Sequence, residues 1–177
     1  QLNNTGRVAA AQSIGTLASS WHVEDTGDFN GDGKADILWR NDSGQIALWT
    51  MDGNHVSSTT SLGTLASSWK IQGAVDFNGD GTSDILWRNS TNGNVVVWNM
   101  DGAGHATSTP NLGIVSNAYH IQALDDFNGD GKDDILWRNT STGQAAEWLM
   151  NGATVASTVD LGKLPTWDVA HHQFDIV

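Results

Sequence analysis

The chain carries three copies of one acidic loop, which begin 48 and then 50 residues apart. They read DFNGDGKAD at 28–36, DFNGDGTSD at 76–84 and DFNGDGKDD at 126–134. In each copy, side chains with oxygen atoms stand at positions 1, 3, 5 and 9, and a glycine stands at position 6. Alternating oxygen ligands, followed by a glycine that permits a sharp turn, wrap a chain around Ca²⁺. The spacing therefore predicts three sites for a hard cation.

The position-7 residue offers its main-chain carbonyl, so its side chain is free to vary. The loops are not EF-hands, because position 12 is tryptophan and DILW reads as a strand. An all-oxygen ligand set disfavours transition metals, and Mg²⁺ prefers to keep its waters. The alternative is a solvated turn without a metal. The predicted ligands are Asp28, Asn30, Asp32, Lys34 and Asp36; Asp76, Asn78, Asp80, Thr82 and Asp84; and Asp126, Asn128, Asp130, Lys132 and Asp134.

We expect about three Ca²⁺ ions with a structural role only. Each ion would offset the repulsion between the three aspartates of its loop, and binding to the folded state alone stabilises that state. Loops of this kind are often tuned to roughly millimolar Ca²⁺, the extracellular regime. The expected location is therefore extracellular or at a cell surface.

The loops belong to a longer repeat. Trp21, Trp69, Tyr119 and Trp167 begin similar units, which gives repeats at 21–68, 69–118 and 119–166. Turn signals divide the first unit into four short strands, at about 21–27, 35–40, 45–51 and 55–62. Four strands in a period of about 40–50 residues are typical of a β-propeller blade. The predicted fold class is all-β, a propeller of four-stranded antiparallel blades.

The third strand of each unit predicts the face that packs against the neighbouring blade. In the first unit Ala47, Trp49 and Met51 alternate and so share one face, with Leu48 on the other. The equivalent sets, Val96, Trp98 and Met100, and Ala146, Trp148 and Met150, repeat this pattern.

The two ends of the chain predict one composite blade. Residues 167–177 resemble the first two strands of a unit, and residues 1–20 resemble the last two. Together they would close a ring of four blades and make residues 1–177 one domain. The rivals are an open fragment of a larger ring and a ring shared between chains, which would make the protein a homo-oligomer.

Composition limits the function. The 177 residues carry a net charge of −12, which argues against nucleic acid and anionic membrane surfaces as partners. No apolar run approaches the length of a membrane span, so we expect no membrane insertion. The chain has no cysteine, which excludes disulfides and thiolate metal sites. Because it begins at Gln1 with no signal-like segment, we interpret it as a processed or trimmed chain.

DFNGDGKADILWRN and its two copies resemble the FG-GAP/VCBS repeats of calcium-bearing β-propellers, such as the integrin α headpiece and several propeller lectins. The resemblance covers about residues 21–166 and implies Ca²⁺ in the three loops. The literal FG and GAP tags are absent, so the bacterial type is the better match. The relatives also have more blades than this chain makes alone, which leaves the ring size open.

We expect a carbohydrate-binding, lectin-like module, because propellers repeat shallow sites that gain strength by multivalency. Aromatic rings would stack on sugars beside polar donors, and the WRN triplet offers such a set. The alternative is that these residues form the core of a blade. The predicted ligand contacts are Trp39, Arg40 and Asn41; Trp87, Arg88 and Asn89; and Trp137, Arg138 and Asn139.

A protein-interaction or adhesion module is the alternative function. We expect no enzyme and no catalytic residue, because the repeated side chains are symmetric and catalysis usually needs an asymmetric set. His171 and His172, near Asp175, are the one unusual cluster, and further zinc ligands for it are not evident. Paired carboxylates for glycosidic cleavage stay open, with Glu24 and Glu147 as the only glutamates.

Overall fold

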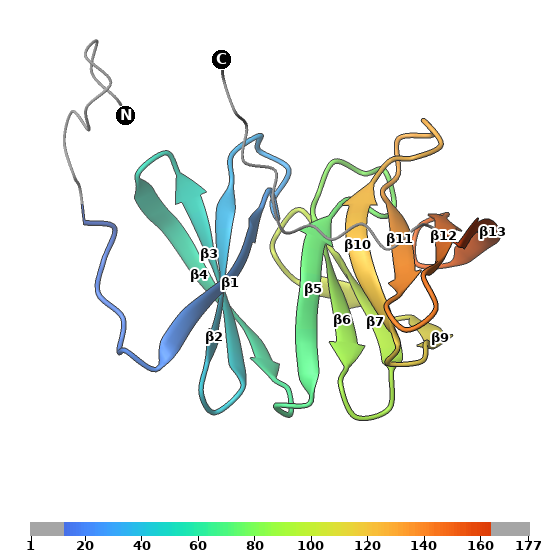
Figure 1. Cartoon of the computed structure of the whole chain (residues 1–177). Helices are drawn as coiled ribbons and strands as arrows, with labels where there is room; N and C mark the ends of the chain where they lie inside the picture. Colours follow the sequence, from blue (N-terminus) through green and yellow to red (C-terminus); the bar gives the residue numbers. More distant parts are fainter. Residues whose placement is uncertain (1–12, 164–177) are drawn as a thin grey trace, which may run out of the picture.

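The computed structural model describes residues 13–163, which form three antiparallel sheets and no helix (Figure 1). Sheet 1 contains β1 (Trp21–Gly27), β2 (Asp36–Asn41), β3 (Gln45–Asp52) and β4 (His55–Thr64). Sheet 2 contains β5 (Trp69–Val75), β6 (Asp84–Asn89), β7 (Asn94–Met100), β8 (Ala106–Ser108) and β9 (Asn111–Ile114). Sheet 3 contains β10 (Tyr119–Asp125), β11 (Asp134–Asn139), β12 (Gln144–Met150) and β13 (Val155–Lys163).

Each sheet is a meander in which consecutive strands pair, as the four-strand repeat predicted. In sheet 2 the fourth strand is divided, and β8 and β9 both pair with β7. The division falls at Pro110, which has no N–H for the ladder. The carbonyl of Pro110 still accepts the N–H of Val97 at 3.1 Å, so the two short strands continue along one edge.

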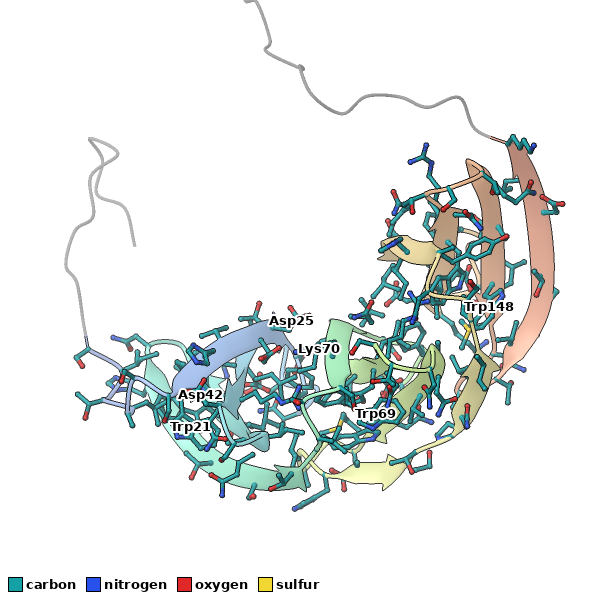
Figure 2. All side chains as sticks on the ribbon, turned by 60° about the horizontal axis from the view of Figure 1, so that its bottom comes forward. Trp21, Asp25, Asp42, Trp69, Lys70 and Trp148 are labelled. Atoms are coloured by element: carbon teal, nitrogen blue, oxygen red, sulfur yellow. The ribbon has the colours of Figure 1, made fainter. Side chains whose placement is uncertain are left out.

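The three sheets follow one another along an arc (Figure 2). Their first strands, β1, β5 and β10, lie toward the concave side, while β4 and β13 lie on the convex side (Figure 2). Residues 13–163 therefore show stacked sheets of one repeat but not a closed ring.

The hydrophobic core lies between successive sheets. Trp87 and Met100 of sheet 2 pack against Phe29, Leu38 and Leu48 of sheet 1. The same contact recurs between sheets 2 and 3, where Trp137 and Met150 pack against Phe77, Leu86 and Val97. Trp98 and Trp148, on the third strands, also pack against these two clusters, so the predicted Trp–Met face does pack against a neighbouring sheet. The residues that it meets lie on the opposite face of that neighbour, which is therefore packed as well.

Each end of the arc has a face that no other described sheet covers. Phe127 of sheet 3 is 40% exposed, whereas its equivalents Phe29 and Phe77 are fully buried. On sheet 1, Trp39 and Trp49 line an open cavity of about 530 Å³ together with Leu17. One end of the arc therefore presents the face that carries Phe127, and the other end presents the face that carries Trp39 and Trp49. These are the two kinds of face that meet in the buried contacts between sheets.

The predicted composite blade falls mostly outside the described residues. Residues 13–20 form no strand but end in a turn, in which the N–H of Trp21 donates to the carbonyl of Ala18 at 3.0 Å. Among residues 13–163 no helix has the length and apolar character to cross a membrane.

Candidate functional site

The acidic loops connect the first and second strands of each sheet, and their own main chain winds them around position 1. Asp28 accepts the N–H groups of Gly31 and Gly33, both at 2.7 Å, while Asn30 accepts that of Asp32 at 2.9 Å. Gly33 has a φ of +79°, a conformation that favours glycine. The sequence therefore folds into a curled loop through hydrogen bonds from its backbone to its own oxygens.

The same winding recurs in the other two loops. Asp76 accepts the N–H groups of Gly79 and Gly81 at 2.7 Å, and Asp126 accepts those of Gly129 and Gly131 at 2.7 and 2.8 Å. These bonds, with that of Gly131 the largest cause, lower the pKa of Asp126. The carboxylate of Asp126 therefore stays charged, with lone pairs left over for a cation.

The position-9 aspartates are buried anchors. Asp36 accepts the N–H of Phe29 at 3.1 Å and that of Met51 on β3 at 2.8 Å. Asp84 binds the N–H groups of Phe77 and Met100 in the same way, at 3.2 and 2.9 Å. Each of these carboxylates therefore ties its loop to the third strand, a structural role that the ligand pattern did not reveal.

Burial without a neutralising charge makes this arrangement electrostatically costly. Burial, reinforced by repulsion from Asp80 and Asp76, raises the pKa of Asp84 to about 7. Burial likewise raises the pKa of Asp36 above its ordinary value. A divalent cation beside these groups would offset that cost.

The loops of neighbouring sheets are joined through their main chains. The N–H of Ser83 donates to the carbonyl of Asp28 at 2.7 Å, which links the loop of sheet 2 to that of sheet 1. The N–H of Asp133 donates to the carbonyl of Asp76, and its carboxylate accepts the N–H of Asp76, both at 2.8 Å. The three loops therefore form one continuous row.

Side chains at position 7 differ between the loops. Lys34 lies 3.1 Å from Asp32 and 3.3 Å from Asp52, and its hydrogen bond lowers the pKa of Asp32. Lys132 lies 3.9 Å from Asp130, whereas the Thr82 hydroxyl donates to Asp80. Within residues 13–163 no three His, Asp or Glu side chains converge as a metal-binding group. The metal-ligand assignment therefore rests on the donor chemistry and the loop winding.

Two of the three tryptophans of the WRN triplets lie between described sheets. Trp87 and Trp137 are buried, while Trp39, on the uncovered face of sheet 1, is half-buried. Each lies against the tryptophan of the third strand, with ring centroids 5.2 Å apart for Trp39 and Trp49 and 5.0 Å for Trp87 and Trp98. This geometry gives Trp87 and Trp137 a packing role, whereas Trp39 borders the open cavity on sheet 1.

The triplet arginines fasten each sheet to the next. Arg88 donates to the carbonyls of Tyr119, Val115 and Ser116 at 2.5, 3.1 and 2.8 Å, and its guanidinium lies 5.2 Å from the ring centroid of Trp137. Arg40 makes the equivalent bonds to Trp69, Leu65 and Ala66. The corresponding partners of Arg138 would lie beyond residue 163, outside the described residues.

The triplet asparagines close the turns between the second and third strands. Asn41 accepts the N–H groups of Ser43 and Gln45, at 3.1 and 2.9 Å. Asn89 and Asn139 accept the corresponding turn N–H groups of Thr91 and Ser141 at 2.9 Å. Their side-chain carbonyls are therefore engaged in turn structure.

Two equivalent grooves run between successive sheets beside these arginines. The first groove, between sheets 1 and 2, has a volume of about 470 Å³, and the second, between sheets 2 and 3, about 270 Å³. Six positions of the repeat line both grooves. In the first they are His22, Glu24, Arg40, Asp42, Ser67 and Lys70, and in the second Lys70, Gln72, Arg88, Ser90, Asn117 and His120.

Apart from the arginines, these groove residues were not predicted as a site. His22, Lys70 and His120 are the second residues of β1, β5 and β10, and this repeated polar position was the available signal. Lys70 lines both grooves and lies at the junction of sheets 1 and 2 (Figure 2). The docking of one sheet on the next creates the grooves, so a single unit does not show them.

The grooves and the acidic loops lie at opposite ends of the sheets. β1 begins at the groove with Trp21 and ends at the loop with Gly27, and β2 returns from Asp36 to Asn41. A seven-residue strand spans about 20 Å at its usual rise per residue. An ion in a loop would therefore be too far away to touch a ligand in a groove.

The comparisons with known proteins agree with this architecture. The family of FG-GAP-like repeats matches residues 28–87 and 76–125, which together span more than half of the chain. A second family, the FG-GAP repeat, matches residues 117–148. A search of curated proteins found no match. The matched segments contain all three acidic loops and most of the strands, and the chain belongs to the FG-GAP-like repeat family.

Proposed function

We propose that the chain is a non-catalytic binding module of the β-propeller type that takes carbohydrate in the grooves between its sheets. The observation that carries this proposal is the one-to-one equivalence of the six positions lining the two grooves. Repeated shallow sites with amide, hydroxyl, imidazole and ammonium groups suit a polyhydroxylated ligand. Two sites on one rigid body would also gain strength through multivalency.

Calcium in the three loops would stabilise the module. The donor set of carboxylates, an amide oxygen and the position-7 carbonyl fits a hard cation, and the wound loops hold these donors near one another. Because the loops form one row across the three sheets, ions bound there would also strengthen the contacts between sheets. Dependence on millimolar Ca²⁺ suits an extracellular or cell-surface protein.

Ring closure would cover the two open ends. The exposed Phe127 face of sheet 3 and the Trp39–Trp49 face of sheet 1 have the chemistry of the buried inter-sheet contacts. We propose that a fourth, composite blade from residues 167–177 and 1–20 lies between them. A ring shared with a second copy is the competing arrangement, and the molar mass in solution distinguishes the two.

Adhesion to a protein is the second candidate, favoured by the family of the chain and by the burial of the triplet tryptophans. Binding to a cell surface that free sugars do not inhibit would support it.

A glycan-array screen of the purified chain in millimolar Ca²⁺, repeated after chelation, tests the first candidate. We expect reproducible binding to a set of related glycans and a loss of binding in chelator as the fold weakens. A blank array from a folded, Ca²⁺-loaded sample would contradict carbohydrate binding and leave adhesion.

A further inference from the structure

The two grooves share one architecture but differ in charge. In the first groove Glu24 and Asp42 balance the positive charges of Arg40 and Lys70. In the second groove the equivalents of the two acids are neutral, Gln72 and Ser90. The second groove therefore lacks both acids but still has an arginine and a lysine, with Lys70 at the place of His22 and His120 at the place of Lys70.

The second groove is therefore lined by two positive charges and no acid, and one of these charges is shared with the first groove. They belong to Lys70 and Arg88, and His120 adds an imidazole. None of the six lining residues is an acid, although the chain as a whole has a net charge of −12. Within residues 13–163 neither Lys70 nor His120 forms an ion pair with a carboxylate. By contrast, His22 of the first groove lies 2.9 Å from Asp42.

The walls of the second groove are held in place by the main chain. Arg88 is only 7% exposed, and three carbonyls fix its guanidinium beside the groove. The Ser90 hydroxyl donates to the carbonyl of Ser68, and Asn117 donates to the carbonyl of Ser90, both at 3.0 Å. Lys70 and His120 are exposed and free to approach a ligand. The groove thus combines a fixed positive charge with two adaptable donors.

We infer that the second groove selects glycans that carry an acidic group, with the carboxylate held between Lys70 and His120. Hydrogen bonds between charged partners are about twice as strong as neutral ones, so the acidic group would dominate recognition. A volume of about 270 Å³ is below the roughly 300–1,000 Å³ of drug-sized sites and suits one terminal sugar. This inference rests on the proposed carbohydrate-binding function.

The test compares 3′-sialyllactose with lactose, which lacks the acidic sugar, by calorimetric titration of the full chain in millimolar Ca²⁺. We expect sialyllactose to bind about tenfold more tightly or better, with an affinity that falls as salt is added. Equal affinities would overturn the inference and leave the proposed function standing. Failure of sialyllactose to bind would overturn the inference, whereas the glycan array decides the proposed function separately.

Two exchanges between the grooves locate the effect. Gln72→Glu with Ser90→Asp gives the second groove the acids of the first and should abolish the preference for sialyllactose. Glu24→Gln with Asp42→Ser makes the reverse change, should leave the preference intact and should strengthen binding of the acidic probe. A preference unchanged by the first exchange, in a variant that melts like the wild type, would place recognition elsewhere and overturn the inference.

Sodium sulfate separates a sugar site from a simple anion site. We expect sulfate to bind at least about tenfold more weakly than sialyllactose, because it makes none of the contacts of the sugar ring. Equal binding, with full competition, would show a site for inorganic anions and overturn the assignment to acidic glycans.

Discussion

The guanidinium of Arg40 on β2 donates to the main-chain carbonyl of Trp69, the first residue of β5, at 2.5 Å. Arg88 makes the same bond to Tyr119, the first residue of β10. One side chain per repeat therefore fixes where the next sheet begins, and with it the groove between the two sheets.

Replacing Arg88 by lysine should weaken the joint between sheets 2 and 3. A single ammonium cannot reproduce the planar fork that reaches three carbonyls. We expect the free energy of unfolding to fall by about 2–3 kcal/mol, the scale of a hydrogen bond to a charged group. Urea unfolding measures the loss, with Lys163→Arg at an exposed position as the control. An unchanged unfolding midpoint in Arg88→Lys would show that the arginine does not fasten the sheets.

Gly93 lies in the turn before β7, where the segment that joins β9 to β10 approaches closely. Its φ is +77°, and a Cβ atom there would lie 2.0 Å from the carbonyl oxygen of Val115, which also accepts a bond from Arg88. Gly162 has nearly the same φ, +76°, but a Cβ atom would meet nothing within 4 Å. The two glycines therefore differ in steric contact and not in backbone conformation.

Gly162→Ala should cost about 1–2 kcal/mol from backbone strain alone. Gly93→Ala should cost about 1–3 kcal/mol more, because Val115 must move. Thermal melting of both variants checks the difference. Equal losses would mean that Val115 yields freely and that the contact is not a constraint.

Calcium removal should lower the stability of the fold, and each site should contribute to it. An ion present at a hundred times its dissociation constant adds about 2.7 kcal/mol. Asp32→Ala should therefore lower the melting temperature in millimolar Ca²⁺ and have much less effect in chelator. Asp42→Ala, which removes an exposed acid at the other end of the sheet, is the control for charge. Equal losses of Asp32→Ala in both solutions would identify the loop as an ordinary turn.

Asp84 gives the ion-free protein a stability that depends on pH. Burial is the main cause of a folded pKa of about 7, against 3.8 for the ordinary carboxyl. Because the folded state holds this proton more tightly, the contribution is fully present below pH 3.8 and is lost as the pH rises through about 7. The free energy of unfolding in chelator should therefore decline across this window because of Asp84.

Asp84→Asn checks that assignment. The amide has no titrating proton, so the part of the decline that Asp84 causes should vanish, although the variant will be less stable throughout. A pH profile in chelator identical in slope to that of the wild type would refute the role of Asp84.

The sequence predicted the strands well because each unit repeats the same turns and alternating residues. The first unit was expected at about 21–27, 35–40, 45–51 and 55–62, and β1 to β4 follow these ranges within two residues. The grooves were not predicted, because they unite residues such as His22 and Lys70 from different sheets. The grooves form only when one sheet docks on the next, and Arg40 fixes that docking by a hydrogen bond to a residue 29 positions later in the sequence.

Identical motifs also lie in different environments, and the sequence of one repeat does not show which environment each copy has. Trp39, Trp87 and Trp137 occupy the same place in the repeat, yet only Trp87 and Trp137 have a described sheet against their face. Likewise, Asp36 fits the ligand pattern of its loop, but the structure also uses both of its oxygens to bind Phe29 and Met51. The spacing of the loop is therefore compatible both with a metal-ligand role for Asp36 and with its hydrogen bonds to the main chain.

The most direct test of carbohydrate binding in the grooves uses Lys70, which lines both of them. A glycan array in millimolar Ca²⁺ would compare the wild type with Lys70→Ala, and Lys163→Ala would control for the loss of an exposed charge. We predict that Lys70→Ala loses binding by about tenfold or more while its melting temperature is unchanged, and that the control binds normally. Binding that is undiminished in Lys70→Ala would contradict the assignment of the ligand to the grooves.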